Sequence, residues 1–363
     1  MLFPDIYPDL LTTDDTMAAA LTAAAAQTAT QFSSVAVDST AAISVAAVQS
    51  SDDSDTPTFA YAGLRDTAMY FSASLLKVSA MLAAFELRQS AGEVASNEAS
   101  CDAATVFGDL QNQFDQDIEN SVPLLLSTPG VTHAMRVPTY STVFATPQPA
   151  PDGGCQLTFD TGFANNMRGM IVDSNNNQAA ATIQALGYSW INGLVSNGGL
   201  FDQSTNTGIW LAGTFLGTMP AVRVPSVNDG PSAQATTTID MTRFLALLIE
   251  AETLDERSDD GISAEMLSLL SDAQSVGDSS WMTTGDRTGY DGLGAGFTIT
   301  HCKIGLGLLK TGADIASEAT ILNHDDTGTQ FLVVWQNVAN SAPEQNAISF
   351  FVRRTILNYL GLP

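Results

Sequence analysis

The sequence predicts an α+β protein with two lobes, in which both ends of the chain build one antiparallel sheet flanked by helices. Strand-like apolar alternation lies near the two ends, at residues 42–62 and 297–335, whereas helical periodicity fills the middle. At 363 residues, with 45% hydrophobic and 14% charged content, the chain is long enough and apolar enough for a large core. A helical lobe inserted between the halves of one sheet fits this order.

These patterns predict an α/β lobe from residues 1–74 and 290–363, and a mostly helical lobe from residues 75–289. Within the helical lobe, residues 100–160 contain six prolines, which indicates an insertion of irregular structure.

The first elements follow from caps and periodicity. Residues 17–31 are rich in alanine and follow two aspartates, which is typical of a capped helix. Residues 42–48 and 58–62 alternate as strands around a loop rich in Asp and Ser, so they predict a hairpin. Residues 75–88 are apolar almost all round and predict a buried helix.

The helical pattern resumes over residues 163–186. Residues 238–252 predict an amphipathic helix capped by Thr238 or Asp240, and residues 262–273 predict another.

The last part of the chain changes to strand patterns. The expected elements are strands at 297–300, 318–322 and 330–335, a hairpin turn at 325–328 and a closing helix at 347–360.

The charge and composition exclude several classes of partner. A formal net charge of −26 repels phosphate backbones and anionic lipids, which argues against nucleic acid and membrane surfaces. No apolar run reaches the ~18 residues that span a bilayer. The start of the chain lacks the basic and apolar regions of a signal peptide, so the compartment stays open: inside the cell, or extracytoplasmic if such a peptide has been removed.

Cysteine and histidine give little sign of metal or redox chemistry. Cys101 and Cys155 bracket one irregular segment and either pair as a disulfide or remain buried thiols, with Cys302 left over. The three histidines lack metal-ligand spacing, so we expect neither a metal nor a cofactor.

The strongest functional signal is the placement of the only three lysines. Lys77 ends the tetrad Ser74-Leu75-Leu76-Lys77, and Lys303 and Lys310 open the triplets Lys303-Ile304-Gly305 and Lys310-Thr311-Gly312. A serine hydroxyl needs a base within hydrogen-bond reach, and residues three apart on a helix share one face. Burial of Lys77 would lower its pKa and leave a free amine that can act as this base. Chance is the competing explanation, because short motifs recur at random.

Two more motifs complete a candidate site. Ser174-Asn175-Asn176 offers a hydroxyl for proton relay and an amide for the substrate, although clustered asparagines are also common in turns. A Lys-x-Gly triplet on a strand offers backbone N–H groups for an oxyanion, and a glycine lets the substrate approach. Either triplet alone is more simply explained as a turn or a strand end.

In this order the motifs resemble those of the penicillin-binding-protein and class A β-lactamase superfamily, from about residue 42 to the end. Further similarities are Met170-Ile171 before and Gly187 after the Ser-x-Asn motif, Thr236-Thr237-Thr238 with Asp240-Met241, and Phe297 before the triplet. The resemblance implies that Ser74 is acylated, Lys77 is its base, Ser174 relays the proton and Asn176 contacts the substrate amide.

The resemblance leaves open which triplet lies in the site. Lys310-Thr311-Gly312 matches literally, but the Lys-x-Gly-x-Gly rhythm favours Lys303, with Gly305 allowing close approach and the Leu306 amide joining the Ser74 amide as an oxyanion donor. Ile304 then lacks the hydroxyl that helps to hold a substrate carboxylate.

The sequence also departs from the family. Class A enzymes deacylate through an omega-loop glutamate, yet no Glu occurs between Glu119 and Glu250, and Asp229 lies too close to Thr236 to replace it. Three hypotheses follow: a serine hydrolase of a small-molecule or peptide-like amide or ester, a class A-like β-lactamase with an unusual deacylation route, and an inactive binding member of the fold. The oligomeric state is not predicted.

Overall fold

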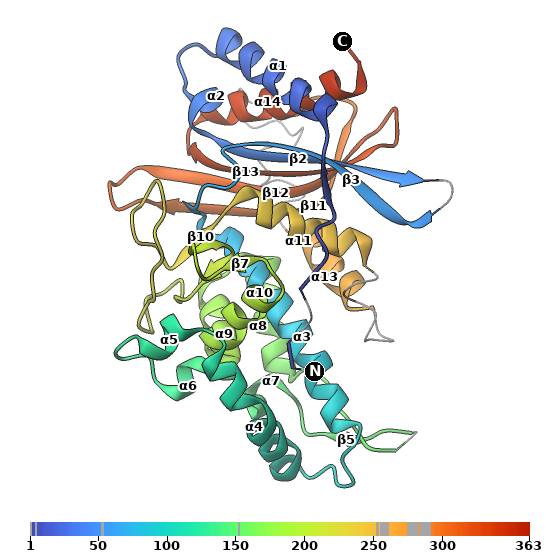
Figure 1. Cartoon of the computed structure of the whole chain (residues 1–363), viewed down its shortest axis with the longest axis vertical. Coiled ribbons are helices and arrows are strands. Elements are labelled where there is room, and N and C mark those ends of the chain that lie inside the picture. Colours follow the sequence, from blue (N-terminus) through green and yellow to red (C-terminus); the bar gives the residue numbers. More distant parts are fainter. Residues whose placement is uncertain are drawn as a thin grey trace.

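The computed structural model describes residues 2–3, 6–51, 54–151, 153–251, 254, 261–273, 282 and 292–363. One six-stranded sheet has helices on both faces, and a helical lobe extends from one of them (Figure 1). The predicted α+β class is therefore confirmed.

The sheet joins the two ends of the chain in the order β1-β3-β2-β13-β12-β11. Its strands are β1 (Leu11–Thr13), β2 (Ala42–Ser51), β3 (Ser54–Leu64), β11 (Phe297–Leu308), β12 (Asp314–His324) and β13 (Gln330–Ala339). β2 pairs with β13 in the middle, where Val45 lies opposite Val333, and all pairs except β1 with β3 are antiparallel. β11 is an edge strand of this sheet, so one side of its backbone has no neighbouring strand within the sheet.

Helices cover both faces of the sheet. On one face lie α1 (Asp15–Gln31), α2 (Val37–Thr40) and α14 (Ala342–Leu360), over a core that includes Trp335 and Phe351. The other face receives the 3-10 helix η1 (Ala73–Leu76), α11 (Thr238–Glu250) and α13 (Ile262–Ser271). Strand residues alternate between the two cores, as a sheet buried on both faces requires.

The helical lobe surrounds α3 (Lys77–Ala95), which runs down from the sheet and is buried along nearly its whole length (Figure 1). The other helices are α4 (Ala103–Asn120), α5 (Pro123–Ser127), α6 (His133–Arg136), α7 (Tyr140–Val143), α8 (Thr161–Ile171), α9 (Asn176–Leu186) and α10 (Tyr188–Asn197). Short strands are β4 (Tyr70–Phe71), β5 (Gln148–Pro149), β6 (Cys155–Gln156), β7 (Phe201–Asp202), β8 (Thr207–Gly208), β9 (Trp210–Leu211) and β10 (Gln234–Thr236). Among the described helices, none combines the length and apolarity needed to cross a bilayer.

The structure corrects two of the helices that the sequence analysis predicted. The helix expected over residues 163–186 is two helices, because Ser174 adopts a left-handed φ of 52° and Asn175 caps α9 by accepting from two backbone amides. The cap of α11 is Thr237 rather than Thr238 or Asp240, since the Thr237 hydroxyl accepts from the Asp240 amide.

A disulfide between Cys101 and Cys155, whose Cα atoms lie 5.5 Å apart, links the two ends of the segment at 100–160. The open choice between a disulfide and free thiols is thereby resolved, and Cys302 is a buried free cysteine. The segment is also less irregular than predicted, since α4 spans eighteen residues of it.

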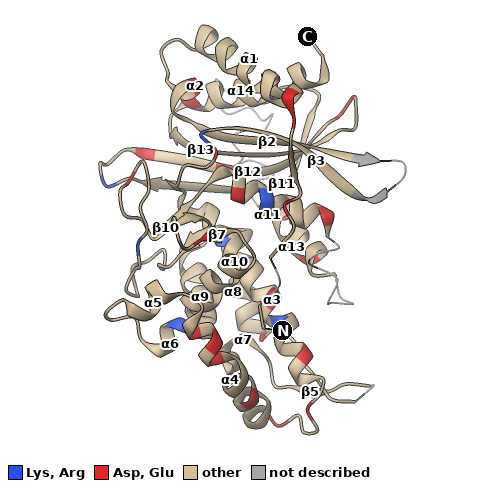
Figure 2. Cartoon of the chain, viewed as in Figure 1, with Lys and Arg blue, Asp and Glu red and all other residues tan. Residues whose placement is uncertain are grey.

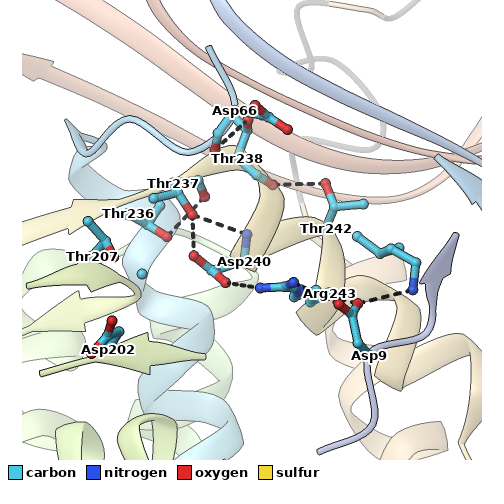
Figure 3. A network of polar contacts seen from close by, with 12 residues as sticks. Asp9, Asp66, Asp202, Thr207, Thr236, Thr237, Thr238, Asp240, Thr242 and Arg243 are labelled. Atoms are coloured by element: carbon cyan, nitrogen blue, oxygen red, sulfur yellow. Dashed lines mark hydrogen bonds and ion pairs between the residues drawn. The ribbon is translucent and has the colours of Figure 1, made fainter. Parts of the chain in front are cut away.

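A polar network fixes the start of α11 beneath the sheet (Figure 3). Asp240 is buried, bonds the Thr237 hydroxyl and pairs with Arg243 at 3.0 Å, and Arg243 also reaches Asp9 at 2.8 Å. Burial raises the pKa of Asp240, while its partners favour the ionised form. Because β10 leads directly into α11 and pairs with β4, this network also positions the strand that precedes Ser74.

Candidate active site

Ser74 lies on η1, at the junction between the sheet and α3. The preceding strand β4 is held by β10, and the Ser72 amide bonds the Gln234 carbonyl at 3.1 Å. Ala73 adopts a left-handed φ of 47°, a strained conformation for a residue with a side chain. Ser74 is only half-buried.

Lys77 begins α3 and is completely buried. Its Nζ donates to the Ser174 carbonyl at 2.6 Å, to Asn176 Oδ1 at 2.8 Å and to Ser174 Oγ at 3.3 Å. A neutral amine can keep both bonds to the carbonyl oxygens and still point its lone pair at a hydroxyl. The site therefore accommodates Lys77 in either protonation state.

The surroundings of Lys77 lower its pKa to about 7, first through burial and then through the positive charge of Lys303. The Phe215 ring lies over Nζ, 4.6 Å from its centroid. Such a contact favours the charged amine by roughly 0.5 to 2 kcal/mol and therefore opposes part of the effect of burial. Near neutral pH a substantial fraction of Lys77 is thus the free base.

Ser174 joins the two lysines. Its left-handed backbone lies between α8 and α9, and its Oγ accepts from Lys303 Nζ at 2.8 Å in addition to its bond with Lys77. Lys303, on β11, is also buried, which lowers its pKa to about 8. The Ser174 hydroxyl thus connects Lys77 of the Ser-x-x-Lys tetrad with Lys303 of the Lys-x-Gly triplet.

The edge strand β11 lies directly against η1 at Gly305. A Cβ at this position would come 2.1 Å from the Ser72 carbonyl oxygen and 2.8 Å from the Leu75 amide nitrogen. Ser317 on β12 supports the same point, since its hydroxyl bonds the Ser72 carbonyl at 2.9 Å. Only glycine permits this approach. The next residue, Leu306, is 44% exposed.

Lys310 lies elsewhere, in the turn that follows β11. Its Nζ donates to the carbonyls of Asp229, at 2.9 Å, and Pro231, and its amide bonds the Asp229 carboxylate. The Lys310-Thr311-Gly312 triplet therefore binds the loop at Asp229 and Pro231 to the β11–β12 turn. The Lys303 triplet instead lies against η1.

Three features of the site had no signal in the sequence. Phe215 lies in the loop between β9 and β10, and Ser317 is one of many serines in the sequence. Ala73 and Ser174 have left-handed backbones, but neither position is a glycine, so the sequence does not indicate this conformation. Each depends on contacts between distant parts of the chain.

The side-chain hydrogen bonds that described residues make at this centre join amines, hydroxyls and carbonyl oxygens. In the part of the chain that the structure describes, no Asp or Glu bonds or pairs with Lys77, Ser174 or Lys303. The described residues also contain no group of three or more His, Cys, Asp or Glu side chains arranged to hold a metal ion.

Comparison with solved structures identifies the architecture. The chain is similar to the TLA-1 extended-spectrum β-lactamase, with 13% identity and a TM-score of 0.51 over 93% of this chain and 99% of that one. The fold is that of a β-lactamase. The TLA-3 extended-spectrum β-lactamase is also similar, with 14% identity and a TM-score of 0.50 over 93% of this chain and 99% of that one. No family model and no curated protein matches the sequence. At this identity the β-lactamase likeness establishes the fold alone.

Proposed function

We propose that the protein is a serine hydrolase that cleaves an amide or ester through an acyl-serine intermediate on Ser74. The observation that carries this proposal is the hydrogen-bonded chain from Lys77 through Ser174 to Lys303, since Lys77 follows the half-buried Ser74 by three residues. Burying two lysines around one hydroxyl costs stability. Such buried, perturbed amines are more common at catalytic sites than elsewhere, which supports a catalytic role for them.

In the first step Ser74 Oγ attacks the substrate carbonyl carbon and gives its proton to neutral Lys77. A pKa of about 7 suits a general base near neutral pH, since the free amine is then both populated and basic. No hydrogen bond joins Ser74 to Lys77 among the described residues, so the contact is expected to tighten when the substrate binds.

In the second step the bond to the leaving amine or alcohol breaks, and the leaving group takes up the proton. Ser174 is suited to deliver it, because its hydroxyl can donate outward while it takes a proton from Lys77. Lys303 donates to the same oxygen and stabilises the negative charge that develops on it. Asn176, which holds Lys77 at 2.8 Å, would also face the substrate amide.

The developing oxyanion needs two N–H donors, and we assign these to the Ser74 and Leu306 amides. The close approach of Gly305 to η1 places the two chain segments side by side, which supports this assignment.

Deacylation is expected to be slow. Water must attack the acyl-serine, and the described contacts of Lys77 include the Phe215 ring but no carboxylate that could activate water. A long-lived acyl-enzyme is therefore the expected state with a good acylating agent.

Intact-protein mass spectrometry tests the proposal with two acylating probes, a fluorescent penicillin and p-nitrophenyl acetate. An adduct should form on the wild type and on Ser90→Ala, a control serine further along α3, but not on Ser74→Ala. An equal adduct on Ser74→Ala would refute the nucleophile. Neither adduct nor turnover with both probes would favour an inactive binding member of the fold.

A further inference from the structure

A cavity of about 220 Å³ adjoins the candidate active site. It lies between the loop at 212–233, Phe71 on β4 and the turn after β11, and its lining includes Thr214, Arg223 and Lys310. Two contacts connect it to the reacting groups. Gly307 lies against the Phe71 ring, where a Cβ would come within 2.9 Å, and Thr214 precedes Phe215, whose ring covers Lys77.

The position of the cavity along β11 indicates which part of a substrate it receives. Gly305 adjoins η1 and Gly307 adjoins the cavity wall, and two residues of extended strand span about 7 Å. Lys303 and Ser174 lie in the opposite direction along the strand, and the proton for the leaving group comes from that side. The cavity therefore faces the acyl part of the substrate.

Arg223 and Lys310 are the exposed cations that line this cavity, and Arg223 makes no hydrogen bond or ion pair with any described residue. Eight arginines lie in the described ranges, and seven of them make hydrogen bonds or ion pairs: Arg65, Arg88, Arg136, Arg168, Arg243, Arg353 and Arg354. Arg223 makes none within those ranges. Lys and Arg are sparse across the molecule, whose net charge is −26, so an unpaired guanidinium beside a reactive centre is unusual (Figure 2).

The cavity's own acid does not neutralise Arg223. Asp229 is mostly buried and accepts from the Lys310 amide, and its carboxylate lies 3.8 Å from Lys310 Nζ. That negative charge is thus balanced within the wall, which leaves the charge of Arg223 uncompensated. A guanidinium with free donors matches a carboxylate in both charge and planar geometry.

We propose that this cavity is a subsite for a carboxylate carried on the acyl part of the substrate, with Arg223 as its anchor. The subsite rests on the proposed hydrolase function and narrows it to substrates with an anionic acyl group. An acyl chain with a carboxylate four methylenes from the scissile carbonyl spans the ~7 Å between Gly305 and the cavity.

Binding without turnover tests the subsite separately from catalysis. In a Ser74→Ala background, NMR titration compares adipamate with hexanamide, which have the same chain length with and without the carboxylate. Adipamate should bind about tenfold more tightly, as expected for one charge-assisted contact. Arg223→Gln should remove the difference, whereas Arg168→Gln, which alters an exposed arginine on α8, should leave it unchanged.

Ester hydrolysis by the active enzyme provides a second test of the subsite. With the mono-p-nitrophenyl ester of adipic acid and p-nitrophenyl hexanoate, Arg223→Gln should lower the preference in kcat/KM for the anionic ester about tenfold, mainly through KM. Equal binding of the two amides, or a preference that survives Arg223→Gln, would overturn the subsite even if Ser74 is acylated. Failure of Ser74 to acylate alongside Arg223-dependent binding would instead overturn the hydrolase.

Discussion

Replacing Lys303 with Met should raise the pKa of Lys77 above its wild-type value of about 7. Burial of Lys77 is the larger cause of its low pKa, and the positive charge of Lys303 is the second. Methionine keeps an unbranched apolar stem in the same place but removes the charge. The protonated form of Lys77 is then less disfavoured, so it should persist to higher pH.

The size of the shift follows from the shared contact with Ser174. Bonds of 3.3 and 2.8 Å to one oxygen hold the two Nζ atoms no more than about 6 Å apart. At an effective dielectric constant of ~20, two unit charges at that distance repel by about 3 kcal/mol, which corresponds to about 2 pKa units. Relaxation and entry of water into the variant will reduce this repulsion, so we expect a rise of about 1 to 2 units.

The chain offers a direct measurement, because it contains only three lysines. Selective 13Cε-lysine labelling should give three NMR signals, and their pH titration reports each amine without any substrate. The variant Lys310→Arg removes the Lys310 signal and so identifies it. It also serves as a control, because Lys310 bonds the Asp229 loop and not Ser174. Titration of Lys77 near its ordinary value of ~10.4 in the wild type would refute the buried base. A Lys77 pKa that does not change in Lys303→Met would refute the electrostatic coupling.

Three further predictions concern other parts of the structure. Gly305→Ala should lower the rate of Ser74 acylation about 100-fold, because the alanine Cβ would collide with the backbone of η1 and move β11. Gly92→Ala is the control: open space surrounds Gly92, so this variant should acylate normally in the same mass assay. Cys101→Ser should lower the free energy of unfolding by about 4 kcal/mol, as estimated for a cross-link across 54 residues. Urea unfolding without reductant should show this loss. If the variant loses as much relative to wild type when both are fully reduced, the disulfide is not the cause. Phe215→Glu would bring a carboxylate near Lys77 and should speed loss of the Ser74 adduct at least tenfold in a mass time course; an unchanged adduct lifetime would show that the missing acid does not limit deacylation.

Features encoded by near neighbours could be predicted from the sequence. The Asp14 cap and apolar spacing predict α1, and the alternating segments predict the β2–β3 hairpin and the strands near the C-terminus. The spacing of Ser74 and Lys77 likewise indicates a shared helical face, because three residues nearly complete one turn. Assignment of these residues to catalysis remains a prediction.

Contacts between distant segments could not be predicted in this way. The helix expected over 163–186 breaks at Ser174, where tertiary bonds to Lys77 and Lys303 compensate a left-handed backbone that local propensity disfavours. The disulfide partner of Cys101 depends on how residues 100–160 fold back on α3.

The sequence by itself determined the order of the motifs, the α+β class and the scarcity of cations, because periodicity and composition are properties of the chain. Only the tertiary structure decided that Lys303 meets Ser174 while Lys310 holds the Asp229 loop. The two triplets look alike in sequence, but β11 ends at Leu308, so one lysine points from the strand into a buried centre and the other lies in an exposed turn. Burial and charge neighbours, which lower the pKa of Lys77, likewise exist only once the chain has folded.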